Sequence, residues 1–414
     1  MHVGIFRGIM FGLAIVLLLS SCQKDGAADY RNEFDAATDF PYQFQMQGDG
    51  IIVAPSEEGY YVLNDSFLFF ADKQNMKPVL LDNRPENDCQ RPSSQGIIEN
   101  CHAYVKHDPS SRPKFLQYYK GKLYTLESGE VWGKDNENRW KTMLIELSKD
   151  GSSRKVVKTF DSMPRSIAIH RGSIYYTLKN YSLDSKASSQ LMHFSLKGSK
   201  KPKPIYTGNE SGSQLQDITP YGKNIYFYEN VGKAVRVMRY DMENGTVTRM
   251  FTNDDGKLHV MQGFYKDRLV YVATTPIANG RMLRDKEHTT VYSSDLEGNN
   301  SVELPIERTF FSFYYASGSY FYARPVFPYL LDERFKDKVK DVRHELTVYD
   351  EKYNPVSSID LSYLPMDHSF MIGDNRYMFV QIFNNGKITM QYLDKNQIGS
   401  GKGTFKPLLE TSIP

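Results

Sequence analysis

Short runs of aromatic and β-branched residues, each introduced by a tight-turn signal, recur along the whole chain. Runs of this composition, bounded by turn residues, are typical of β-strands. The copies recur about every 50 residues, a period typical of a repeat architecture. The seven copies read GYYVL from Gly59, GKLYTL from Gly121, GSIYYTL from Gly172, GKNIYFY from Gly222, DRLVYV from Asp267, GSYFYA from Gly318 and GDNRYMFV from Gly373.

Each copy also contains a second piece, in which two further strands are joined by a tight turn. Examples are LIELSKDGSSRKVVKTF, VRVMRYDMENGTVTRMF and TVYSSDLEGNNSVELPI, whose Asp-Gly, Asn-Gly and Gly-Asn pairs suit two-residue hairpins. With one strand before each turn, a copy supplies four antiparallel strands, the pattern of a β-propeller blade. We therefore predict an all-β fold, a β-propeller of seven four-stranded blades over residues 40–414. A six- or eight-bladed propeller and a pair of β-sandwiches are the alternatives.

The longest predicted connections all fall on one face of this propeller. Successive strands alternate in direction, so two of the connections in each copy lie at one end of the strands and two at the other. The long stretches belong to one of these ends: residues 127–140, 179–190, 274–288 and 324–344, with the link 82–105 after the first copy. Because long loops on a rigid scaffold commonly carry function, we predict that this face binds a ligand.

These stretches contain the residue types that dominate contact energy in binding sites, namely Trp, Tyr and Arg. The alternative role for each is to anchor its own loop onto the blades. The last stretch also has a helical pattern of apolar residues, which predicts a helix packed on the propeller or, alternatively, a lid. The binding candidates are Trp132, Trp140, Arg281, Arg284, Phe327 and Tyr329, and the helical pattern comprises Leu331, Phe335, Val339 and Val342.

The N-terminal 21 residues have the features of a bacterial lipoprotein signal peptide. Arg7 precedes an apolar run to Leu19, which is about the length of a signal-peptide core and too short to span a membrane. The run ends in Leu-Ser-Ser-Cys, which resembles a lipobox and implies cleavage before Cys22 and lipidation of that residue. An ordinary secretory signal is the alternative. Residues 22–39 are polar and are predicted to be a flexible tether.

This N-terminus predicts a location outside the cytoplasm, with the chain held on a membrane by the lipid on Cys22. Gln23 follows the cysteine, so the aspartate that retains lipoproteins in the inner membrane is absent. The protein is therefore expected on the outer leaflet of a Gram-positive membrane or on an outer membrane, exposed at the cell surface.

Composition and charge narrow the classes of partner. The chain has 29 tyrosines and 24 phenylalanines, which favour strands, and a formal net charge of +2. A nearly neutral chain gives no electrostatic case for binding nucleic acid. We expect a monomer without a cofactor or a resident metal ion, which binds an unknown protein, peptide or glycan.

Two cysteines in the stretch DNRPENDCQRPSSQGIIENCHAYV predict a disulfide. Outside the cytoplasm Cys89 and Cys101 can pair, because Cys22 is taken by lipid. A metal site with His102 and His107 is an alternative, although the spacing is not a standard zinc pattern. Two free thiols are the remaining possibility.

The run YYVLNDSFLFFADKQNMKPVLLDNRPENDC, with CHAYV and LQYYKGKLYTLE after it, resembles the opening of a group of bacterial surface lipoproteins. Members carry a β-propeller domain of unknown function, distantly similar to the propeller of the low-density-lipoprotein receptor. The resemblance implies a surface location and a propeller fold. It does not indicate an activity, since the family has none assigned. The chain differs at Asp82, where the family has its first cysteine, and Cys89 and Cys101 match the later two.

Sequence motifs of catalysis are missing from the chain. It has no G-x-S-x-G, H-E-x-x-H or phosphate-binding loop motif, and no Asp-box of sialidase-like propellers. We therefore expect a non-catalytic binding protein. The alternative is a propeller hydrolase or lyase that acts on glycans with carboxylates at its central funnel. The densest polar cluster entering an inner strand comprises Asp254, Asp255 and His259, for which a solvated link is the simpler reading.

Overall fold

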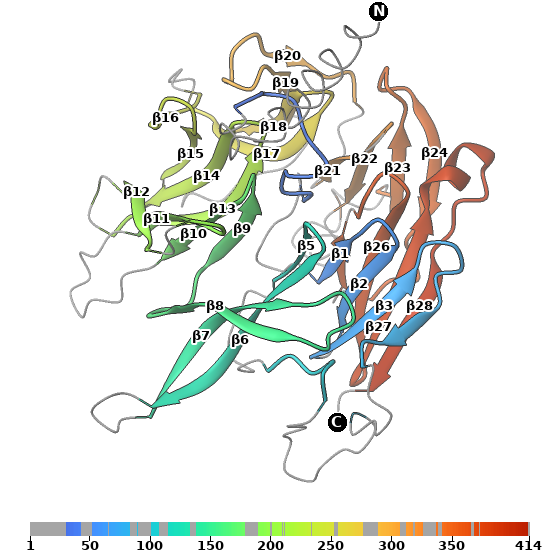
Figure 1. Ribbon diagram of the computed structural model, residues 1–414. Helices are drawn as coiled ribbons and strands as arrows, with labels where there is room; N and C mark the ends of the chain where they lie inside the picture. Colours follow the sequence, from blue (N-terminus) through green and yellow to red (C-terminus); the bar gives the residue numbers. More distant parts are fainter. Residues whose placement is uncertain are drawn as a thin grey trace, which may run out of the picture.

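Seven four-stranded antiparallel sheets are arranged in a ring, and the predicted seven-bladed β-propeller is confirmed (Figure 1). The first blade, in blue, lies beside the last, in red. The computed structural model describes residues 30–42, 52–64, 66–82, 89, 101–106, 115–132, 138–178, 189–198, 201–208, 210, 212–232, 234–251, 256–275, 289–306, 312–317, 319–325, 337, 342–365, 368–371 and 373–412.

Within every blade the four strands follow one another in sequence and pair in that order. Blade 1 comprises β1 (Val53–Pro55), β2 (Gly59–Asn64), β3 (Phe67–Asp72) and β4 (Pro78–Leu80). Blade 2 comprises β5 (Leu116–Tyr119), β6 (Lys122–Trp132), β7 (Asn138–Leu147) and β8 (Arg154–Phe160). Blade 3 comprises β9 (Ser166–His170), β10 (Ser173–Leu178), β11 (Gln190–Ser195) and β12 (Lys203–Thr207).

The remaining blades repeat this plan. Blade 4 comprises β13 (Gln214–Tyr221), β14 (Asn224–Val231), β15 (Ala234–Asp241) and β16 (Thr246–Arg249). Blade 5 comprises β17 (Leu258–Tyr265), β18 (Arg268–Thr274), β19 (Thr289–Ser294) and β20 (Val302–Glu303). Blade 6 comprises β21 (Ser312–Ser317), β22 (Tyr320–Pro325), β23 (Glu345–Tyr349) and β24 (Pro355–Asp360). Blade 7 comprises β25 (His368–Met371), β26 (Tyr377–Asn384), β27 (Lys387–Asp394), the 3-10 helix η4 (Lys395–Ser400) and β28 (Lys406–Ser412).

Buried polar side chains join the innermost strands of neighbouring blades. The amide of Gln117 donates to the Ile169 carbonyl oxygen at 2.7 Å and accepts the Ile169 N–H at 2.9 Å. Ser166 Oγ accepts the N–H of Ile218 at 2.8 Å. Each of these contacts joins positions 52 residues apart. The repeat read from the sequence therefore corresponds to a structural repeat, in which each blade stabilises the next.

The ring closes between blade 7 and blade 1 through side chains, because no strand is exchanged between these two blades. Gln381 Nε2 donates to Asn64 Oδ1 at 3.0 Å, and both side chains are buried. The hydroxyl of Tyr60 donates to Asp374 Oδ2 at 2.8 Å, and the Tyr60 ring contacts the ring of Phe379. Closure thus depends on a few buried contacts between residues more than 300 positions apart.

Aromatic side chains fill the spaces between blades, which explains the high tyrosine content. Their hydroxyl groups reach the turn between the third and fourth strands of the next blade. Tyr61 donates to the Lys149 carbonyl oxygen at 3.0 Å, and Tyr226 donates to the Leu296 carbonyl oxygen at 2.8 Å. Buried tyrosines usually find such a partner, because an unpaired hydroxyl group is costly to bury.

The outermost strands carry prolines in blades 1, 3, 6 and 7. These residues are Pro78, Pro204, Pro355 and Pro407. The pairing register shifts beside three of them, in β12, β24 and β28. Proline has no N–H to donate, so it is tolerated at a sheet edge and prevents continued pairing there.

The segment 30–42 packs against the ring before the first blade begins. Phe40 and Tyr42 are buried, and the Tyr42 hydroxyl donates to the carbonyl oxygens of Val53 and Leu116, in the inner strands of blades 1 and 2. Residues 30–39, which the sequence assigns to the tether, are thus packed on the propeller. Over the described part of the chain, no helix has both the length and the apolar character needed to cross a membrane.

Candidate functional site

The two faces of the ring differ in the length of their connections. On one face, here called the short-turn face, lie the turns from first to second strand, such as 120–121, 171–172 and 222–223, and those from third to fourth. The other face, here called the long-loop face, receives the connections 81–115, 179–189, 275–288 and 326–344. The three longest connections therefore lie on a single face, where the sequence predicted the binding site, while 395–405 on the short-turn face is as long as 179–189.

The two tryptophans lie on strands rather than in a loop. The stretch 127–140 was expected to be a loop, but strands β6 and β7 extend through most of it, and residues 133–137 connect them. The main chain of Trp140 pairs with Glu130, and that of Trp132 pairs with Asn138. The loop prediction was wrong because the glycine and polar residues of this stretch have the composition of a loop, although the pairing of β6 with β7 continues through most of it. The extended hairpin projects beyond the ring (Figure 1).

The other predicted binding residues fall outside the described part of the chain. These are Arg281, Arg284, Phe327 and Tyr329. Cys22 and most of the predicted helix, at Leu331, Phe335 and Val339, also lie outside it. Val342, the last apolar position of that helical pattern, is described and is not helical.

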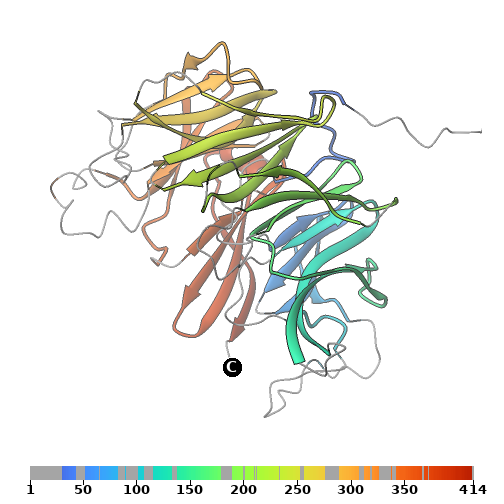
Figure 2. The ribbon, with the colours of Figure 1, turned by 90° about the vertical axis from the view of Figure 1, so that its left-hand side faces the viewer.

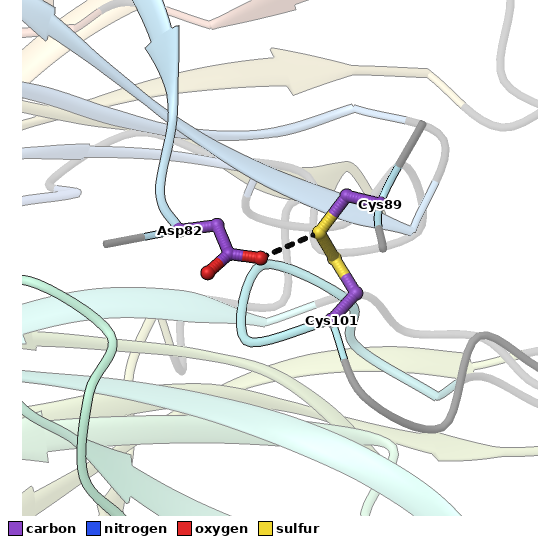
Figure 3. Close-up of side chains that lie close together, drawn as sticks. All are labelled: Asp82, Cys89 and Cys101. Atoms are coloured by element: carbon purple, nitrogen blue, oxygen red, sulfur yellow. Dashed lines mark hydrogen bonds between the residues drawn. A yellow bond between two sulfur atoms is a disulfide. The ribbon is translucent and has the colours of Figure 1, made fainter. Parts of the chain in front are cut away.

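A disulfide between Cys89 and Cys101 lies on the long-loop face, with the two Cα atoms 5.0 Å apart (Figure 3). The chain after Cys101 is pinned to blade 1, because the Leu68 N–H donates to the Ala103 carbonyl oxygen at 2.8 Å, and the Val105 N–H donates to that of Ser66 at 2.7 Å. Both Ala103 and Val105 are buried. The disulfide therefore ties the link between blades 1 and 2 to a firmly packed segment.

Asp82 lies beside this disulfide, with Oδ2 of its carboxylate 2.8 Å from the Cys89 sulfur (Figure 3). Ligand atoms of Asp82, Cys89 and Cys101 lie within 4.8 Å of one another. They are the one group of three potential metal ligands that converges among the described residues. With both sulfurs in a disulfide, the thiolates that a metal ion would need are not formed. His102 is described but is not part of this group, and His107 lies outside the described residues.

Two of the buried carboxylates on the blades lie beside arginines. Glu229, which is 1% exposed, accepts the Tyr206 hydroxyl at 3.1 Å and lies 3.6 Å from the Arg236 guanidinium. Glu127 pairs with Arg154, while burial raises the pKa of this carboxyl. These carboxylates belong to different blades, and Arg236 also pairs with Glu210, at 2.7 Å.

His259, from the predicted polar cluster, packs among aromatic rings. Its ring stacks on Phe251, with centroids 4.8 Å apart, and Phe251 contacts Tyr271 in turn. Asp254 and Asp255 lie outside the described residues. The histidine is thus part of an aromatic group at the edge of blade 5.

Sequence reasoning missed a group of buried hydroxyls between blades 3 and 4, toward the long-loop face. The hydroxyls of Ser189 and Ser213 have no hydrogen-bond partner, although both residues are 1% exposed. Gly208 lies against them, where a Cβ atom would fall 1.6 Å from Ser213 Oγ and 3.2 Å from a Glu229 carboxylate oxygen. Isolated serines in links carry no sequence signal for such a group.

Comparison with models of known families gave no match, and comparison with curated protein sequences gave none either. Solved structures do match. A prolyl endopeptidase is 12% identical over 91% of this chain and 50% of its own, with a TM-score of 0.51. The tricorn protease is 10% identical over 92% of this chain and 36% of its own, with a TM-score of 0.50. The propeller domain of the Trilobed protease from Pyrococcus furiosus is 13% identical over 71% and 82%, with a TM-score of 0.45.

At such low identity these comparisons bear on the fold alone. The chain spans about half the length of the prolyl endopeptidase that it matches and about a third of the tricorn protease. The similarity thus defines the class of protein as a β-propeller.

Proposed function

We propose that this protein is a membrane-anchored extracytoplasmic lipoprotein whose propeller binds a protein, peptide or glycan through its long-loop face, without catalysis. The proposal rests on how the connections between strands are divided between the two faces of the ring. The three longest, 81–115, 275–288 and 326–344, all leave the same face of a closed ring. Insertions on one face of a rigid scaffold are the usual way in which propellers and related folds build a binding surface.

The chemistry of the described residues supports binding rather than hydrolysis. Near the long-loop end of blade 6, the Arg324 guanidinium lies 5.1 Å from the centre of the Phe313 ring and 5.8 Å from that of Tyr315. Arginines and aromatic rings of this kind dominate binding energy at contact surfaces. The buried carboxylates Glu127 and Glu229, by contrast, are occupied by arginines.

Lipid anchoring rests on the signal peptide and on the resemblance to surface lipoproteins. The disulfide between Cys89 and Cys101 supports the same compartment, because disulfides persist outside the cytoplasm. Mass spectrometry of the mature protein tests the anchor. We expect an acylated Cys22 at the N-terminus, and the Cys22→Ser chain should stay soluble. A mature wild-type chain without acyl groups would refute the anchor.

The binding face is tested with arrays of cell-surface glycans and peptides, probed with the Cys22→Ser chain. We expect Arg281→Glu with Arg284→Glu, or Trp132→Ala with Trp140→Ala, to abolish binding while the melting temperature changes by no more than a few degrees. Lys122→Glu is the matched control, because Lys122 is exposed on the short-turn face.

Three results would contradict this assignment. One is the absence of binding to any arrayed ligand. Another is equal loss of binding in the Lys122→Glu control. The third is unfolding of the arginine or tryptophan variants, which would mean that these residues stabilise the fold rather than bind the ligand. Release of cleaved glycan products by the wild-type chain would favour the hydrolase or lyase instead.

A further inference from the structure

The segment 30–42 is held on the short-turn face by a buried ion pair. Arg171 occupies the turn between β9 and β10, and its Nε donates to Asp39 Oδ1 at 2.6 Å, while Nη2 lies 3.1 Å from Oδ2. The same guanidinium donates to the carbonyl oxygens of Arg31 at 2.8 Å and Glu33 at 2.9 Å. One side chain thus binds the segment at three points. Figure 2 shows the segment, in dark blue, at the ends of green strands.

The turn between β13 and β14 of blade 4 forms a second contact with the segment 30–42. The rings of Phe34 and Tyr221 stack with centroids 6.1 Å apart. A Cβ atom on Gly222 would lie 2.1 Å from the carbonyl oxygen of Asn32, and the φ of this glycine is +55°. Any other residue here would push the segment away from the blade.

The inner end of the segment is equally fixed. The Phe40 N–H donates to Nδ1 of the buried His170 at 3.0 Å, and Nε2 of that ring donates to the Gly222 carbonyl oxygen at 2.7 Å. Tyr42 then bonds the inner strands of blades 1 and 2. From Tyr30 to Tyr42 the chain therefore has a definite course, and Tyr30, at its outer end, is exposed over the short-turn face of blades 3 and 4.

The length of chain before Tyr30 limits where a lipid on Cys22 can lie. The two positions are eight steps apart along the chain, and even a fully extended chain of that length spans only about 28 Å. A strand of eight residues already rises about 26 Å, so the blades themselves are nearly as tall as this reach. A tether that starts over the short-turn face cannot also pass around the outer edge to the long-loop face.

We propose that the short-turn face of blades 2 to 4 lies on the membrane surface and that the long-loop face points away from it. This proposal rests on the lipid anchoring proposed above. Its occupant is a phospholipid bilayer, and the charge near the anchor fits anionic headgroups. Exposed lysines gather there on the turns and adjoining strand ends of blades 2 and 3, at Lys120, Lys122, Lys197, Lys201 and Lys203. Basic residues close to a membrane are attracted by its negative surface potential.

Fluorescence quenching tests this orientation on the lipidated chain, reconstituted in vesicles of phosphatidylcholine and phosphatidylglycerol that contain headgroup-quencher lipids. A single fluorophore is placed at Lys122→Cys, on the short-turn face, or at Asp161→Cys, which is exposed on the long-loop face. We expect several-fold stronger quenching at position 122. A flexible Gly-Ser insertion between Lys24 and Asp25 should weaken that quenching without touching the fold.

The outcomes separate this proposal from the one on which it rests. A purified chain that carries no lipid refutes the anchor and the orientation together. A lipidated chain with equal quenching at both positions, or stronger quenching at position 161, refutes the orientation alone. Ligand binding by the long-loop face is measured separately on the unlipidated chain, so its failure leaves the quenching result standing.

Discussion

His170 links the packing of the N-terminal segment to pH. Burial lowers the pKa of His170 from 6.5 to about 4, although Asp39, 3.9 Å away, favours the protonated form. The neutral ring accepts the Phe40 N–H at Nδ1, and a proton on that nitrogen would abolish the bond. Because the folded-state pKa lies below that of the unfolded chain, the unfolded state binds the proton first as the pH falls. The stability that the neutral ring contributes is therefore present above pH 6.5 and is lost between pH 6.5 and 4.

The size of this loss follows from the two pKa values. A drop from 6.5 to about 4 corresponds to roughly 3 kcal/mol at the lower end of that range. Urea unfolding of the unlipidated chain at intervals from pH 7 to pH 4 measures it. Other groups also titrate there, so His170→Asn serves as the reference, since its amide oxygen can still accept the Phe40 N–H. We expect the wild-type curve to fall more steeply by about that amount, whereas parallel curves would refute the reasoning.

Three further predictions concern buried groups. Asp39→Ala should lower the free energy of unfolding by about 3–5 kcal/mol, because it leaves the Arg171 charge buried without its partner; denaturant unfolding measures this, and a loss below 1 kcal/mol would contradict it. Gln381→Ala should cost about 1–3 kcal/mol and speed amide hydrogen exchange in blades 1 and 7 more than in blade 4, since it removes the bond to Asn64; uniform exchange would contradict closure by side chains. Burial lowers the pKa of Lys395 from 10.5 to about 7. Between pH 7 and 9 the folded protein therefore releases this proton while the unfolded chain keeps it, so the free energy of unfolding of the wild type should rise with pH. Lys395→Met should remove that rise.

The blades could be predicted from the sequence because each is encoded locally. A hairpin turn such as the one at Gly172 and the strands on either side of it lie within a few residues of each other, so composition and turn chemistry reveal them. The hairpin extension at Trp132 and Trp140 was not recognised, because its residues have the composition of a loop. Its pairing depends on the ladder that continues from the buried part of β6 and β7.

Contacts between distant parts of the chain could not be predicted in the same way. Asp39 is the last residue of the predicted tether and Phe40 the first of the predicted propeller, and their partners Arg171 and His170 lie about 130 positions further along. Only the folded ring brings these four residues together. Strand alternation fixes which connections share an end, so the face that carries the longest connections could be predicted. The binding role of that face and of its individual residues stays a prediction.

The prolines of the outer strands acquire a further meaning for a protein held on a surface. The lipid anchor proposed above would confine all copies to two dimensions with the same side up, so their rims would meet edge to edge at high local concentration. Pro78, Pro204, Pro355 and Pro407 interrupt the rows of donors along these rims. These interruptions would keep neighbouring copies from pairing the edges of their sheets. The copies would then stay separate molecules even in a crowded layer.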